Sequence, residues 1–523
     1  MAGLPPDGER EAPSGGTRTG SSRILVGAAL VLAVGLVAVA AVWLGGALGT
    51  PAGTLQATGL PSVLPSATTP RQPAASYPSS AVDPSGTAPS GGPPSPAAQP
   101  SESASPSATP RVSHASGLIA AIDDSGALST VDARTGAKVD YPALGVVFTF
   151  PAWSPDGSRI AAVGQSTNEV GIYVFRVSRG GAPGGEPAVL YRSPDQQPFY
   201  LYWTPDSRRV SFLTSETTGL ALRVAPIDAR PPLDGTDAGS IIRRGAPLYF
   251  QWLNANRVLL HVGGGTDAFV GQVDADGTAI GSATVATGLF RTATQSLDGR
   301  YFAYATSTTG AEGEMVLQAT RGLSAHHLSA FGPAAMLFDP VGDTLATIAA
   351  DKPDPDPVTI PRGPLRLIDT ASGASRTVID GSVVGFFWSP DGKTIAALRV
   401  VGSGQGPAAD VLRPVPAFAQ ARAPTAGAVA TSTGSPIDLV FVDVATGAVR
   451  SEREVRLADT FVGQLLPYFD QYALSHTVWS RDSTSILLPL VAGTGQDQLT
   501  IVTADGSSDP VPIADGPSGF WRP

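Results

Sequence analysis

The stretch "WSPDGSRIA", residues 153–161, recurs along this chain of 523 residues. Close copies are "WTPDSRRVS" from Trp203, "WSPDGKTIA" from Trp388 and "WSRDSTSIL" from Trp479. Short β-rich runs flank the turn letters, "VFTFPAW" before them and "RIAAVG" after them. Pro presets φ at the first central position of a type I turn, Asp suits the second, and Gly accepts positive φ at the exit. The motif therefore predicts a strand, a tight turn and a second strand, with Trp placed to pack against a neighbouring unit.

The position of the Trp in this motif, here called the anchor position, returns along the rest of the chain. Weaker copies are "QSLDGRYFA" from Gln295 and "FDPVGDTLA" from Phe338. Most steps between anchors are about 40 to 50 residues, a period that indicates a repeat architecture such as a propeller or a solenoid. The anchor positions are Trp153, Trp203, Trp252, Gln295, Phe338, Trp388, Trp479 and Trp521.

A second signature alternates with the anchors. "VDARTG" (131–136), "IDTASG" (368–373) and "VDVATG" (442–447) each follow a short β-rich run, and Asp four residues before Gly suits a hairpin. Each repeat then holds four strands, which is the size of a propeller blade. The sequence predicts an all-β fold, a β-propeller of four-stranded blades: eight, or seven if one weaker copy is not a blade.

The two ends of the repeat region complement each other. Residues 117–123, "GLIAAID", have the pattern of a second strand with no first strand before it. The last residues, "SGFWRP", have the pattern of a first strand with nothing after it. We therefore expect the two ends to pair and close the ring.

These motifs resemble the TolB-like, WD40-like propeller repeat, over roughly the last 400 residues of the chain. The resemblance implies a β-propeller that is usually exported and works as a binding platform. The residues before the repeats show no separate globular domain of the kind that TolB itself carries.

The bulk composition excludes several classes of function. Lys plus Arg is 34 and Asp plus Glu is 44, so the net charge of −10 argues against nucleic acid as a partner. The chain has no cysteine, which excludes disulfides, thiol catalysis and zinc–thiolate sites.

The N-terminal part predicts a membrane anchor. Residues 24–48 carry no charge, and 25 residues at about 1.5 Å each exceed the roughly 30 Å hydrocarbon core. Three arginines in residues 1–23 precede this segment, so we expect the N-terminal tail in the cytoplasm and the rest outside. Residues 49–115 are rich in Pro, Ser, Ala and Thr, which predicts a disordered linker before a propeller over 116–523.

The motifs do not indicate catalysis. No G-x-S-x-G nucleophile elbow occurs, and no βαβ region remains to hold one. The D-x-x-T-G turns at Asp132 and Asp443 also occur in eight-bladed quinoprotein dehydrogenases, but the docking Trp that follows the turn in those repeats is missing. We expect a non-catalytic binding or scaffold module without cofactor or metal; a quinoprotein-like or other propeller enzyme is the alternative.

Three long insertions, 351–357, 401–436 and 458–476, are expected on one face of the ring, because they join second to third strands or outer to inner strands. The sequence predicts contact with a protein or cell-envelope partner on this face, since loops on a rigid scaffold often bind. The alternative is that the aromatic residues of 458–476 only cover the blade beneath them. The closely spaced carboxylates of 351–357 also suit calcium. The candidate residues are Tyr468, Phe469, Asp470 and Tyr472 as the contact cluster and Asp351, Asp354 and Asp356 as an acidic rim.

Overall fold

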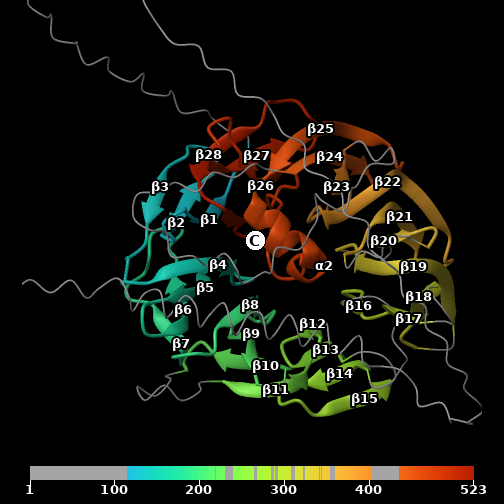
Figure 1. Ribbon diagram of the computed structural model, residues 1–523, viewed down its shortest axis with the longest axis horizontal. Helices are drawn as coiled ribbons and strands as arrows, with labels where there is room; N and C mark the ends of the chain where they lie inside the picture. Colours follow the sequence, from blue (N-terminus) through green and yellow to red (C-terminus); the bar gives the residue numbers. More distant parts are fainter. Residues whose placement is uncertain are drawn as a thin grey trace, which may run out of the picture. The chain divides into compact units, whose positions relative to one another are not determined.

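The computed structural model describes residues 115–217, 219–229, 239–263, 268–283, 288, 292–307, 312–321, 324–340, 342, 344–353, 360–401 and 435–523. Antiparallel sheets stand around a common centre in this part of the chain, so the fold is an all-β propeller (Figure 1). The predicted tail (1–23), membrane helix (24–48) and linker (49–115) lie outside the described residues, apart from Ala115. Among the described residues, no helix has the length and apolar character needed to span a membrane.

Four blades are separate four-stranded sheets. In blades 2, 3 and 4 the strands follow chain order from the centre of the ring outward (Figure 1). Blade 1 combines β29 (Ser518–Trp521), β1 (Leu118–Ile122), β2 (Leu128–Asp132) and β3 (Lys138–Asp140). Blade 2 holds β4 (Val147–Trp153), β5 (Arg159–Gln165), β6 (Val170–Arg176) and β7 (Ala188–Ser193); blade 3 holds β8 (Pro198–Trp203), β9 (Arg209–Glu216), β10 (Gly219–Pro226) and β11 (Ser240–Gly245); blade 4 holds β12 (Leu248–Asn254), β13 (Arg257–Val262), β14 (Phe269–Asp274) and β15 (Ala279–Ala283).

The other blades belong to one sheet of 13 strands. Two strands of 14 residues, β19 and β22, join blades 5, 6 and 7, because each is the outer strand of one blade and the inner strand of the next. Blade 8 joins the sheet through the antiparallel pair of Leu457 and Leu490. Blade 5 starts with β16 (Thr294–Gln295), β17 (Tyr301–Ser307) and β18 (Glu312–Ala319), followed by β19 (Ala325–Phe338); blade 6 adds β20 (Thr344–Ala350), β21 (Gly363–Asp369) and β22 (Ser375–Trp388); blade 7 adds β23 (Thr394–Val400), β24 (Ser435–Asp443) and β25 (Val449–Leu457); blade 8 holds β26 (Ser485–Val491), β27 (Asp497–Thr503) and β28 (Val511–Asp515).

The inner edge of blade 8 is an isolated bridge between Trp479 and Ile486. Four separate sheets and four blades in the long sheet make eight (4 + 4), the number that the sequence favours. Each anchor position lies within two residues of the end of an inner strand or, at Trp479, in this bridge.

The ends of the repeat region pair as expected. β29 lies antiparallel to β1, with Phe520 opposite Ala120 and Gly519 opposite Ala121. The C-terminal strand therefore supplies the inner strand of the first blade and closes the ring.

A repeated hydrogen bond joins neighbouring blades at the anchors. The indole Nε1 of Trp203 donates to the carbonyl oxygen of Ala152, the residue just before the anchor of the preceding blade, at 3.0 Å. We call this contact the anchor latch. Around it, alanine, valine and aromatic side chains of the two blades form a shared buried core. The other anchor latches run from Trp153 to Phe520 (3.0 Å), from Trp388 to Leu337 (3.2 Å) and from Trp479 to Phe387 (3.0 Å).

Other anchors replace the latch with different chemistry. Gln295 stands where Trp is expected, and its backbone N–H donates to the side chain of Gln251 of blade 4 at 2.9 Å. The indole of Trp252 donates to the Ser211 hydroxyl at 2.8 Å. At Trp521, Nε1 is buried and has no hydrogen-bond partner within the described part of the chain.

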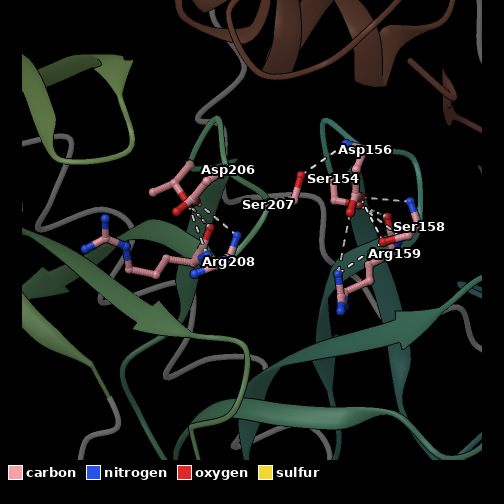
Figure 2. Close-up of polar contacts among 9 residues, drawn as sticks. Ser154, Asp156, Ser158, Arg159, Asp206, Ser207 and Arg208 are labelled. Atoms are coloured by element: carbon pink, nitrogen blue, oxygen red, sulfur yellow. Dashed lines mark hydrogen bonds and ion pairs between the residues drawn. The ribbon is translucent and has the colours of Figure 1, made fainter.

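The turn after each strong anchor is fixed by its own polar side chains (Figure 2). The Ser154 hydroxyl donates to Asp156 Oδ1 at 2.6 Å, and the backbone N–H of Ser158 donates to the same oxygen at 3.0 Å. Gly157 has φ +65°, as the predicted turn requires. The Asp residues of the motif are therefore structural parts of the turn.

Two turns carry Ser in place of this glycine. Ser207 and Ser483 have φ of 60° and 59°, a conformation that costs a non-glycine residue roughly 1–2 kcal/mol. Each hydroxyl accepts the backbone N–H of the turn Asp in the preceding blade: Ser207 from Asp156 at 3.0 Å, and Ser483 from Asp391 at 3.1 Å (Figure 2 shows the first pair). The serine thus links adjacent blades in a way that glycine cannot.

The anchor latch predicts a difference between two substitutions of the same kind. Trp203→Phe should lower the free energy of unfolding by roughly 1–2 kcal/mol more than Trp521→Phe. Both indoles are buried, but only the first substitution removes a donor from a buried carbonyl. Denaturant unfolding of both variants measures this difference, and equal losses would contradict a role for the hydrogen bond.

Candidate functional site in the central channel

The insertion between β25 and Trp479 folds into short helical turns at the centre of the ring (Figure 1). These are η2 (Phe461–Leu465), η3 (Leu466–Tyr468) and α2 (Phe469–Tyr472). A helical segment with apolar residues on all sides must be buried to be stable. We call residues 461–472 the plug, because α2 contacts the inner strands of several blades, including β12 and β22.

The side chain of Gln471 fixes the plug to blade 4. Its Oε1 accepts the backbone N–H of Phe250 at 3.2 Å, and its Nε2 donates to the carbonyl of Phe250 at 2.7 Å. The Thr292 hydroxyl donates to the same Oε1 at 3.3 Å, and the Tyr200 hydroxyl donates to the Gln471 carbonyl at 2.5 Å. The plug therefore has hydrogen bonds to blades 3 and 4 and to the residues that enter blade 5.

Aromatic contacts fix the remaining sides of the plug. Phe469 lies edge-on to Phe386 of β22, with ring centroids 5.3 Å apart. Tyr472 lies edge-on to Tyr200 of blade 3 at 5.2 Å and stacks on Phe150 of blade 2 at 6.1 Å. Packed aromatic pairs of this kind add roughly 0.5–1.5 kcal/mol each beyond burial.

This packing corrects the expectation of an exposed contact cluster. Phe469 and Asp470 are 0% exposed and Tyr472 is 8% exposed, whereas Tyr468 is 36% exposed. Burial also raises the pKa of Tyr472. Three of the four residues lie in the channel because the insertion folds inward, so their surfaces face the blades. Partner contact stays a prediction, and in this arrangement Tyr468 is the member of the cluster that can make it.

The acidic rim is only partly described. Asp351 forms an ion pair with Arg366 of β21, so its charge is already neutralised locally. Asp354 and Asp356 lie outside the described residues. Within the described ranges, no group of three or more His, Asp or Glu side chains is placed to hold a metal ion.

The strand order places the described ends of the three insertions on one face. The first insertion begins after the second strand of blade 6 and ends before its third strand, and the second insertion lies between the same strands of blade 7. Residues 354–359 of the first insertion lie outside the described residues. The plug insertion joins an outer strand to the next inner edge, and such connections leave an antiparallel blade on the same side. The middle of the second insertion, 402–434, lies outside the described residues.

A small crevice remains beside the plug. Its volume of about 20 Å³ suits roughly one water molecule. The lining is mainly apolar, with Phe461 and Leu465 from the plug, Leu487 from β26 and Phe520 from β29. The channel is therefore closely packed at this point.

His476 is a buried residue that the sequence analysis did not single out. Its ring lies 4.5 Å from Phe520 and 5.2 Å from Tyr472, and its Nδ1 is 2.7 Å from the Ser475 hydroxyl. Burial lowers the pKa of His476 to about 3. His476 and Gln471 are among the few polar residues of the mainly apolar insertion 458–476. Polar residues in such an apolar segment are the sequence signal that could have predicted a buried polar role.

No known protein-family model matches the chain, and no curated protein matches it. Solved structures with some similarity include TolB from Acinetobacter baumannii, 17% identical over 50% of this chain and 62% of that chain, with a TM-score of 0.31. A eukaryotic initiation factor is 12% identical over 78% of this chain and 99% of that chain, with a TM-score of 0.43. A dihydro-heme d1 dehydrogenase is 13% identical over 78% of this chain and 76% of that chain, with a TM-score of 0.43.

At such identities and TM-scores, the fold assignment depends on the strand pairing of this chain itself. The compared proteins include a dehydrogenase as well as TolB, so they do not decide between a binding module and an enzyme.

The buried histidine predicts a pH-dependent stability. Because the folded pKa lies below the unfolded value of about 6.5, the unfolded state binds the proton more readily between these values. The contribution of His476 to the free energy of unfolding should be fully present above pH 6.5. Below that pH it should fall by up to about 1.4 kcal/mol per pH unit. His476→Phe should lack this contribution.

Denaturant unfolding at pH 7.5 and pH 5 measures the slope for both proteins. An unchanged slope in His476→Phe would show that the imidazole is not neutral and buried in the folded state.

Proposed function

We propose that this chain is a membrane-anchored, extracytoplasmic β-propeller that acts as a non-catalytic binding or scaffold module for a protein or cell-envelope partner. The observation that supports it is the plug, because the chain fills its own central channel. Gln471 and Tyr200 direct their polar groups into contacts that hold the plug, and the crevice beside it is small and mainly apolar. A ligand of ordinary size needs a larger pocket with convergent polar groups. Binding on the outside of a rigid ring is the use that this arrangement favours.

The face that carries the insertions is the proposed contact surface. Its loops extend from fixed strand ends, and loops on a rigid scaffold commonly carry binding residues. Tyr468 ends η3 in the plug insertion and is 36% exposed, whereas its neighbours Phe469 and Tyr472 are buried. An exposed aromatic side chain beside a buried segment suits an interface anchor.

The membrane anchor and the cellular location are part of the proposal. The uncharged segment 24–48 is long enough to span a bilayer, and Arg10, Arg18 and Arg23 precede it. This arrangement favours a cytoplasmic tail, a single membrane helix and an external propeller on the linker 49–115.

The absence of cysteine from the chain allows one experiment to test location and contact face together. Single substitutions Tyr468→Cys, Leu297→Cys and Ser14→Cys are labelled with a membrane-impermeant maleimide. Leu297 is 72% exposed on an anchor turn, at the opposite ends of the strands from the plug insertion, and is the matched control. Labelling rates are compared for intact cells, lysed cells and purified chain.

In intact cells the positions 468 and 297 should react, and position 14 should react only after lysis. Position 468 should also react at least severalfold more slowly in cells than in the purified chain, whereas position 297 should not. Labelling of position 14 alone in intact cells would overturn the topology. Equal rates at position 468 in cells and in the purified chain would overturn the contact face.

A further inference from the structure

A groove opens on the outer part of the ring between blades 2 and 3. Its volume is about 640 Å³. Strands β5, β6 and β7 form one wall, and residues just after β10 form the other. The site lies away from the plug and the insertions, so it is independent of the function proposed above.

Two arginines stand side by side at this groove. Arg159 of β5 and Arg176 of β6 are direct cross-strand partners, so their side chains leave the same face of the sheet. Both line the groove. Like charges directly opposite each other destabilise an antiparallel pair. The chain has a net charge of −10, so a pair of adjacent arginines stands out in it. The pair indicates that binding of an anionic group offsets the repulsion between the two guanidinium groups.

Local carboxylates neutralise this pair only weakly. The closest carboxylate oxygen to Arg159 is Asp156 Oδ2 at 3.8 Å, and the same Asp is held by hydrogen bonds within its turn. Arg176 is exposed and has no ion pair within the described part of the chain. Arg159 Nη1 donates to the Ser158 hydroxyl at 3.1 Å, which holds its guanidinium beside the turn (Figure 2).

The rest of the groove is mixed in character. The half-buried Ala188 and Ile227 give it apolar walls, while Glu186 and Asp228 are exposed acidic residues in its lining. A third arginine of the lining, Arg192, forms an ion pair with Glu169. An anionic group would therefore be attracted to the arginine pair and repelled by the acidic side chains. A ligand that fits has its negative charge gathered at one end and an apolar, extended body.

We infer that this groove binds an extended peptide segment that has adjacent acidic residues at one end, with Arg159 and Arg176 binding their carboxylates. Arginine suits this role because its planar guanidinium can bind a carboxylate through two parallel hydrogen bonds. The apolar side chains of the peptide would lie along Ala188 and Ile227. A peptide fits these walls better than a phosphate polymer, which carries charge along its whole length.

Fluorescence anisotropy with the purified full-length chain tests this inference. The probe is a labelled peptide Glu-Glu-Val-Ala-Val, and the matched peptide has Gln in place of both Glu residues. The chain is used as wild type, as the double variant Arg159→Ala with Arg176→Ala, as Arg176→Glu, and as Arg321→Ala. Arg321 lies in blade 5 outside the groove and controls for the loss of one positive charge.

The wild type should bind the Glu peptide at least tenfold more tightly than the Gln peptide, and the double variant should lose this preference while Arg321→Ala keeps it. Arg176→Glu should also lose binding, yet its melting temperature should rise, because Glu replaces a repulsive cross-strand partner of Arg159. A merely structural role for Arg176 would lower the melting temperature instead.

Two results would overturn the inference. One is equal affinity of the wild type for the two peptides. The other is inorganic tripolyphosphate binding to the arginine pair without any binding of the Glu peptide, which would make the groove a phosphate site. Loss of binding in a variant counts only where its circular dichroism spectrum matches that of the wild type.

Discussion

The hydrogen bond from an anchor indole to the carbonyl before the neighbouring anchor is the contact on which the ring depends. It fixes the distance and the rotation between adjacent blades at their inner edges, where the blades are closest. Trp153 makes this bond to Phe520 of β29, so the same contact that joins ordinary neighbours also joins the two ends of the repeat region. The motif recurs because the anchors Trp153, Trp203, Trp388 and Trp479 each make the same contact with the preceding blade.

Ring closure creates a central channel, and the apolar surface of this channel explains why the plug insertion folds inward. Inner strands present Phe150, Tyr200 and Phe386 toward the plug, so an apolar segment of the right length can replace water there. The side chain of Gln471 forms hydrogen bonds with both the backbone N–H and the carbonyl of Phe250. The plug thus contacts several blades at once, and we expect it to stabilise the ring as a whole. Its filling of the channel leaves the faces and the outer grooves for binding.

Much of the fold could be predicted because its chemistry is local and repeated. The Ser-x-Asp turn, the Asp–Thr hairpin at Asp132 and the pairing of the chain's last strand with its first all depend on short motifs, and the structure confirms each of them. The place of Phe469 and Tyr472 could not be predicted in the same way. Aromatic residues suit a contact surface and a buried channel equally well, and the choice depends on inner strands that are up to about 300 residues away in the sequence. The continuity of β19 through Gly332 and Pro333 was also hidden, since these residues usually end a strand.

Hydrogen exchange of the plug backbone is the most direct measurement of the central claim, that the chain closes its ring and fills its own channel. The account predicts that amides of residues 461–472 exchange about as slowly as those of β12, because the plug is packed between blades and is released only when the ring opens. Exchange of the plug within seconds, at the rate of the exposed turn at 143–145, would contradict it.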